Sequence, residues 1–371
     1  MESMGDLAAA LPGNEDTEVH DFLLRLRQAY ESDMPLYPLH HIQELLDFAA
    51  YHKSCPYGLD PSYIGIDFFG DKKRFTFSES ALQYATLDLS SIQWLICMPY
   101  LCSDSRNILT RAFSLRPMDY GDLLGPSIPQ SNRTRCFQRR LTDAQQIWKQ
   151  SKIRSRIEGS IHRALRHCYV RSHQPFTKIL AIGLGYHDPY GWVFGQQHAF
   201  VLDLSHKLQG PEPNLPEVEV VFQDHTYCDI NMKTALEMLG PSIKVIRDKN
   251  FRHVFSFDDS TLIIALNHLK FPLKEIIADY ATIIGPHMRM PRAIIWEQGV
   301  PITWEEMEGL ASRLNANPEK QCELEFRQDS PRTNRLEALY DKLEFPASQK
   351  EDDEDNPFQA NNKLTLYMRK E

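Results

Sequence analysis

Two glycines and an aspartate stand where a nucleotide-type ligand would bind in a fold that alternates strands and helices. Gly183 and Gly185 directly follow the apolar run 178–182, and Asp224 directly follows the run 218–223. Two glycines at this spacing permit a tight turn and a close approach of the backbone to a ligand. A carboxylate after the second strand is suited to hold ribose hydroxyl groups. The combination is similar to S-adenosylmethionine sites, whereas the lack of a third glycine at its usual place argues against the NAD or FAD fingerprint.

Three histidines also follow predicted strands: His225, His268 and His287. Imidazole titrates near neutral pH and can act as a general acid or base. We therefore take His268 and His225 as candidate catalytic residues. The alternative is that each histidine hydrogen-bonds its own loop, because fourteen histidines in 371 residues make chance placement easy. We predict no metal site.

The other candidates for the ligand-binding edge are Tyr186, Gln197, Asn267 and Gly285. Tyr186 shares its loop with Tyr190, Trp192 and Phe194. These rings can stack on a planar ligand such as a nucleobase or porphyrin, or they can close the sheet edge as core. The sequence contains neither a GxSxG elbow nor a P-loop, so hydrolase and ATPase chemistry are not indicated. It does not identify a cofactor.

The segments that must position these residues alternate between short apolar runs and helical patterns. We expect strands at 178–182, 218–223, 242–246, 261–266 and 281–284, and helices at 196–208, 230–239 and 273–280. Such alternation implies a parallel sheet with right-handed crossovers. Ligands bind outside the carboxyl ends of the strands of such a sheet. The predicted fold class is α/β: a Rossmann-like, doubly wound, mainly parallel sheet with a helical N-terminal extension.

The regions flanking this domain have simpler patterns. Residues 1–18 are polar and expected to be disordered, and 19–141 form an α+β extension with two helices and short strands. The Rossmann-like domain with its preceding helix takes 142–310. The remainder, 311–371, is read as an accessory helix and a polar, acidic, largely disordered tail.

A basic helix is predicted at 142–173, because Ile153, Ile157, Ile161 and Leu165 recur at helical spacing. Between residues 133 and 171 the chain carries eleven Lys or Arg against two acidic residues. One interpretation is a contact surface for phosphate, nucleic acid or a protein. The other is a solvated face on a helix that packs against the following domain.

Composition restricts the class of protein. The net charge is −9 and the pI about 5.9, which argues against a dedicated nucleic-acid binder. No apolar run reaches the roughly 18 to 20 residues of a membrane-spanning helix, and no secretory signal pattern opens the chain. The seven cysteines are scattered without a CxxC pair. We expect a cytoplasmic or nuclear protein with free thiols.

The order of motifs resembles the Sensitivity-to-Red-light-Reduced-like (SRR-like) family over about a third of the chain. The segments that carry the likeness are KILAIGLGYHDP, GQQHAFVLDL, VVFQDHTYCDINMKTALEMLG, STLIIALNHLKFPLKEII and ATIIGP. Gln197 matches the glutamine that opens a helix in the family, and Asp224 matches the acid-containing loop. Asn267 departs from the family's proline and Pro286 from its asparagine. The long N-terminal region is typical of a divergent, fungal-type member.

The resemblance implies a regulatory protein, associated with circadian and light signalling or with tetrapyrrole metabolism. It would bind a small ligand or a protein partner at the carboxyl edge of the sheet. The residues leave two alternatives open. One is a cofactor-dependent enzyme, either an S-adenosylmethionine-dependent transferase or an NAD(P)-linked oxidoreductase. The other is a pure protein-interaction scaffold that uses the basic helix and the acidic tail.

Overall fold

The chain forms two compact units that are interleaved in sequence. The first unit comprises Met1–Pro117, Lys274–Gly285 and Pro301–Thr333, and the second comprises Met118–Leu273, Pro286–Val300 and Asn334–Glu371. The computed structural model describes residues 15–32, 34–37, 39–54, 62–66, 71–77, 85–89, 113–117, 130–172, 174–184, 192–209, 217–224, 230–246, 256–266, 272–283, 290–315, 329–346, 358 and 364–370.

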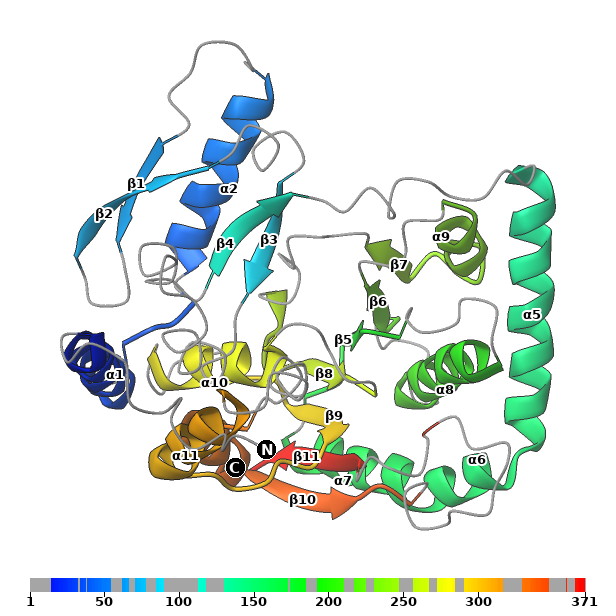
Figure 1. Cartoon of the computed structure of the whole chain (residues 1–371). Coiled ribbons are helices and arrows are strands. Elements are labelled where there is room, and N and C mark those ends of the chain that lie inside the picture. The colour runs from blue at the N-terminus through cyan, green and yellow to red at the C-terminus, as the bar shows by residue number, and fades with distance from the viewer. Residues whose placement is uncertain are drawn as a thin grey trace, which may run out of the picture. The chain divides into compact units, whose positions relative to one another are not determined.

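A seven-stranded mixed sheet is the centre of the second unit (Figure 1). Its strands are β5 (Lys178–Ile182), β6 (Glu219–Gln223), β7 (Ile243–Ile246), β8 (Thr261–Ile264), β9 (Ala293–Glu297), β10 (Tyr340–Glu344) and β11 (Leu364–Arg369). The order across the sheet is β10-β11-β9-β8-β5-β6-β7. The five strands from β9 to β7 are parallel, and β11 runs antiparallel to both of its neighbours.

The composition of the central strands explains why they lie inside the sheet. In strands β5, β6 and β8 every residue after the first is buried, and all of these residues except Gln223 are Ile, Leu, Val, Ala or Phe. A strand covered on both faces has no polar side to alternate with, so continuous apolar runs are typical of parallel sheets. The expected α/β fold class, with a mostly parallel sheet compatible with a Rossmann-like fold, is therefore confirmed.

Helices cover one face of this sheet. They are α5 (Gln130–Gln150), α6 (Lys152–Ile157), a π-helical turn η2 (Glu158–His162), α7 (Arg163–Ser172), α8 (Trp192–Leu208) and α9 (Ile230–Glu237). In Figure 1, α8 and α9 lie between the sheet and α5. A Cβ atom built on Gly195 of α8 would lie 2.6 Å from Cβ of Ala144 in α5, so the two helices approach closely at that glycine.

The basic helix differs from its prediction. It begins at Gln130 rather than near residue 142, and it is interrupted at Ser151. The Ser151 hydroxyl accepts a hydrogen bond from the backbone N–H of Arg154 at 3.1 Å and so caps α6. The predicted apolar stripe is confirmed, since Ile153, Ile157, Ile161 and Leu165 are all buried in the core of the second unit.

The first unit contains helices and two small antiparallel ladders. Its elements are α1 (Glu15–Glu31), α2 (Leu39–Ser54), β1 (Ser62–Ile66), β2 (Lys72–Thr76), β3 (Ala85–Leu89), β4 (Phe113–Pro117), α10 (Leu273–Ile283, from Lys274 on) and α11 (Trp304–Asn315). Strand β1 pairs with β2, and β3 with β4. Helix α1 begins at Glu15, inside the stretch expected to be disordered. Helix α13 (Pro331–Ala338) contributes residues to both units.

Two further expectations are wrong. The predicted strand 281–284 is instead the end of helix α10, and the fifth parallel strand is β9, about ten residues later. A four-residue apolar run does not distinguish a strand from a buried helical turn, which explains the error. The tail was expected to be largely disordered, yet 340–344 and 364–369 form β10 and β11, and β11 lies inside the sheet between β9 and β10.

Candidate functional site

The parallel strands reverse their order on either side of β5. The chain passes from β5 to β6 and β7 on one side, and then returns to β8 and β9 on the other. A crevice forms where successive crossovers diverge in this way, and ligands bind at the carboxyl ends of the strands beside it. We call this part of the second unit the switch edge. Its described residues are Ile182, Gly183, Leu184, Gln223, Asp224, Ala265 and Leu266.

Gly183 makes the turn that leaves β5. Its φ is 72°, in the left-handed region that side chains other than glycine rarely adopt. Its backbone N–H donates a hydrogen bond to the carbonyl oxygen of Gln223 at 3.0 Å, which fixes the turn to the end of β6. The predicted need for glycine at this position is therefore explained by the backbone itself.

Two polar residues lie side by side in the chain at the end of β6. Asp224 directly follows the strand and is only 3% exposed, and Gln223 is fully buried. Within the part of the chain that the structure describes, neither the Nε2 nor the Oε1 atom of Gln223 has a hydrogen-bond partner. A buried polar group without a partner loses the hydrogen bonds that water would have supplied. The switch edge therefore combines a buried carboxylate with an unsatisfied amide.

The first turns of α8 carry buried polar side chains to the same end of the sheet. Gln196, Gln197 and His198 are all buried, although they lie on successive positions of the helix. The ring of His198 lies 4.9 Å from the ring of Phe222, with 34° between their planes. Because Phe222 is two residues before Asp224, this contact places the beginning of α8 over the carboxyl end of β6. Gln197 belongs to this first turn of α8, and its role at the switch edge stays a prediction.

Several predicted site residues lie outside the described residues: Gly185, Tyr186, His225, Asn267, His268, Gly285 and His287. Their grouping into one site stays a prediction. Gly285 was predicted to follow a strand at 281–284. This prediction is wrong, because residues up to Ile283 belong to helix α10. Gln223, the last residue of the second predicted strand, is also a candidate from the sequence, and the structure adds that its side-chain amide is buried without a hydrogen-bond partner among the described residues.

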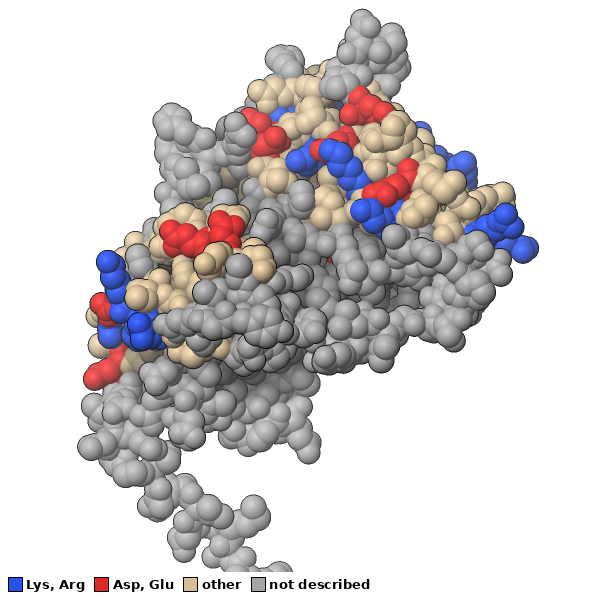
Figure 2. All heavy atoms as spheres, turned by 90° about the horizontal axis from the view of Figure 1, so that it is seen from above, with Lys and Arg blue, Asp and Glu red and all other residues tan. Residues whose placement is uncertain are grey.

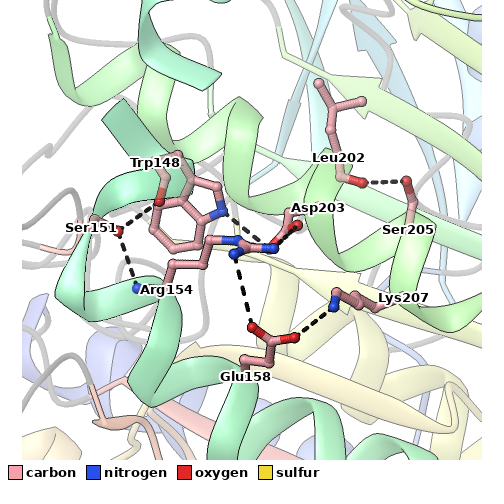
Figure 3. A network of polar contacts seen from close by, with 8 residues as sticks. All are labelled: Trp148, Ser151, Arg154, Glu158, Leu202, Asp203, Ser205 and Lys207. Atoms are coloured by element: carbon pink, nitrogen blue, oxygen red, sulfur yellow. Dashed lines mark hydrogen bonds and ion pairs between the residues drawn. The ribbon is translucent and has the colours of Figure 1, made fainter. Parts of the chain in front are cut away.

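The basic helix contributes a polar network within the second unit (Figure 3). Arg154 donates to both carboxylate oxygens of Asp203 in α8, from Nε at 3.0 Å and from Nη2 at 3.2 Å. The Nε1 atom of Trp148 donates to the same carboxylate at 3.3 Å. Glu158 lies between Arg154, at 3.9 Å, and Lys207, at 2.5 Å. These contacts hold α5, α6, η2 and α8 together.

Charge in this network is compensated locally. The hydrogen bond to Asp203 raises the pKa of Arg154, and the hydrogen bond from Lys207 lowers the pKa of Glu158. Figure 2 shows the face seen from above in Figure 1 and does not identify the residues of this network; on that face, basic and acidic side chains of the described residues are intermixed. Arg154 is therefore a structural residue. The contacts of Arg154 agree with the interpretation of a packed helix, and a role of the basic helix in partner contact stays a prediction.

His162 was not singled out by sequence reasoning. It ends the π-helical turn η2, and neither of its ring nitrogens has a hydrogen-bond partner among the residues that the structure describes. Burial lowers the pKa of His162, while the carboxylates of Asp203 and Glu158 act in the opposite direction. π-Helical turns often occur at functional sites. His162 lies near the network of Arg154 only because η2 packs against α8. The spacing of residues in the sequence therefore did not indicate this position.

The first unit has a buried polar cluster of its own. The guanidinium of Arg332 forms an ion pair with Asp279, and both side chains are 1% exposed. Arg332 also donates to the carbonyl oxygens of Tyr30 and Met34, each at 2.7 Å. The backbone N–H of Tyr37 donates to Asp279 at 2.8 Å. Burial raises the pKa of Asp279 to about 6, although Arg332 partly opposes this effect. The cluster holds together segments that are far apart in the sequence.

No family model, curated protein or solved structure matches this chain. Within the described residues, no three His, Cys, Asp or Glu side chains are grouped so that they could hold a metal ion. None of the described helices is both long and apolar enough to cross a membrane.

Proposed function

We propose that the protein binds S-adenosylmethionine at the switch edge and transfers its methyl group to an acceptor. The order of the strands carries this proposal. If the seven strands of the sheet are numbered along the chain from β5 to β11, their order across the sheet is 3-2-1-4-5-7-6. The seventh strand, β11, is antiparallel to both of its neighbours. This is the arrangement of S-adenosylmethionine-dependent methyltransferases. NAD-dependent dehydrogenases use the order 3-2-1-4-5-6 instead.

A shared fold is not sufficient evidence for a shared activity, so the site must also fit the ligand. The Gly183 turn, with its positive φ, leaves room for the amino-acid part of the cofactor to approach the backbone. Asp224 is the carboxylate at the end of the second strand, where ribose hydroxyl groups are held in nucleotide-binding folds of this kind. Gly183 and Asp224 follow the neighbouring parallel strands β5 and β6 at their carboxyl ends.

Methyl transfer is compatible with the residues at hand. The methyl group of a sulfonium is already activated, and the leaving thioether is neutral and needs no proton. Holding the acceptor in line with the carbon–sulfur bond therefore supplies much of the rate. An acceptor such as an amine or hydroxyl must lose a proton, and His225 and His268 remain the candidate bases on sequence grounds.

The SRR-like resemblance stays a proposal beside this one. Support comes from two matched motifs: the Gly-Leu-Gly turn, in which Gly183 has a positive φ, and the Leu239-Gly240 pair, which lies in the turn after helix α9. A regulatory role and methyl transfer do not conflict, because a methyltransferase can act on a regulatory target. The carboxyl-edge ligand predicted for a regulatory protein would here be the methyl donor.

Calorimetric titration and thermal shift with S-adenosylmethionine, S-adenosylhomocysteine, NADH and NADPH test the proposal. At about 100 times its dissociation constant, a ligand stabilises the folded chain by roughly 2.7 kcal/mol. We expect a shift with the first two ligands, and its loss in Gly183→Val and Asp224→Asn. Asp341→Asn, an exposed aspartate in β10, is the matched control. A shift with NADH or NADPH alone would support an oxidoreductase instead, and no shift at all would favour the interaction scaffold.

A further inference from the structure

No group of the described residues satisfies the side-chain amide of Gln223. Gln223 is the last residue of β6, and in the ladder it lies opposite Ile182 of β5 and Ile246 of β7. Side chains alternate along a strand, so Gln223 shares its face of the sheet with Val221. Both atoms of its amide are buried and unpartnered. The conclusion does not depend on how the amide is oriented, because exchanging its nitrogen and oxygen leaves both without a partner.

An amide in this place costs stability. An apolar side chain of the same size would fill the volume without an unsatisfied donor and acceptor. The three residues before it are apolar and buried: Val220, Val221 and Phe222. A polar side chain at the end of such a strand is therefore most simply explained by a group that is supplied from outside the chain.

We propose that Gln223 recognises the adenine ring of the cofactor and makes the switch edge specific for adenine. This inference rests on the proposed binding of S-adenosylmethionine. Asp224, the next residue, would hold the ribose, and the base is joined directly to that sugar. A glutamine amide offers a donor and an acceptor side by side, which matches the N7 acceptor and the N6 amino donor of adenine.

The pairing predicts which bases are excluded. Hypoxanthine carries an oxygen in place of the amino group at position 6, so it presents two acceptors on this edge, and the amide can satisfy only one of them. A 7-deaza analogue keeps the amino group but has a C–H in place of N7. Each change removes one of the two hydrogen bonds and leaves part of the Gln223 amide buried without a partner.

The test compares the binding of S-adenosylhomocysteine, its 7-deaza analogue and its inosine analogue to the full-length chain. The wild type should bind S-adenosylhomocysteine at least tenfold more tightly than either analogue. In Gln223→Leu, binding of S-adenosylhomocysteine should weaken ten- to a hundredfold, and the three ligands should become nearly equal. Gln223→Met is a second variant of similar volume, and Gln146→Leu on the exposed side of α5 is the control.

Stability without ligand separates recognition from a structural role. Gln223→Leu should be at least as stable as the wild type, since it removes an unsatisfied amide. Equal binding of all three ligands to the wild type would overturn the role of Gln223 while leaving cofactor binding intact. A clear loss of stability in both Gln223 variants would also overturn it. If the wild type binds none of the three ligands, the proposed function fails and this inference fails with it.

Discussion

Arg154 and Asp203 form a two-point ion pair between α6 and α8, with donor–acceptor distances of 3.0 and 3.2 Å (Figure 3). Their side chains are 24% and 15% exposed, so solvent screens the pair only in part. We expect Arg154→Met to lower the free energy of unfolding by about 1 kcal/mol, measured by urea denaturation. Arg163→Met, at an exposed position of α7, should have a much smaller effect. Equal effects would mean that Arg154 has no structural role.

Gly195 is required for the close approach of α5 and α8. In Gly195→Ala the new methyl group would lie 2.6 Å from Cβ of Ala144, so the helices must move apart. We expect a loss of about 1–3 kcal/mol, because overpacking exceeds the gain in helix propensity. Gly159→Ala is the matched control, since its Cβ would meet no atom within 4 Å. Partial rescue by Ala144→Gly would assign the loss to this contact; a Gly195→Ala variant as stable as Gly159→Ala would refute it.

His162 should make stability depend on pH. Its pKa is lowered in the folded chain by burial, so the unfolded chain binds a proton at higher pH than the folded one. Stability is therefore full above the unfolded pKa of about 6.5 and is lost as the pH falls toward the folded value. His162→Leu should flatten the stability profile between pH 7 and pH 5. His167→Leu, which removes an exposed imidazole from α7, is the control; identical profiles for wild type and His162→Leu would exclude the effect.

The buried pair of Asp279 and Arg332 should dominate the stability of the first unit. Asp279→Ala leaves the guanidinium of Arg332 buried without its counter-ion, and removing one partner of such a pair costs about 3–5 kcal/mol. Combining it with Arg332→Met should cost less than the sum of the two single changes. The control is Asp71→Ala, which breaks the exposed pair with Arg25 and should cost at most about 1 kcal/mol. An additive double variant would argue against coupling.

The C-terminal residues should be essential to the sheet. Ending the chain after residue 346 removes β11, which pairs with both β9 and β10, and should abolish the cooperative unfolding of the second unit. A milder change, Leu366→Ala, empties a fully buried position opposite Ile295 and should cost about 2–5 kcal/mol. Lys370→Ala is the exposed control. A truncated chain with wild-type stability would show that β11 is dispensable.

The alternation of elements was predictable because it is encoded locally. Four of the five predicted strands and all three predicted helices of the central region coincide with observed elements to within a few residues. Gly183 and Asp224 were also identified correctly as residues at the ends of β5 and β6. The error at 281–284 has a local cause as well, since a short apolar run suits a strand and a helical turn equally.

Only the tertiary structure decided the strand order, the insertion of β11, the pairing of Arg154 with Asp203 and the isolation of the Gln223 amide. Each of these depends on residues that are far apart in the sequence and meet only when whole elements pack. Period and composition determine whether a segment forms a strand and which of its faces is apolar. They do not determine which strand lies beside it, and the neighbours decide whether a polar side chain finds a partner or is left to bind a ligand.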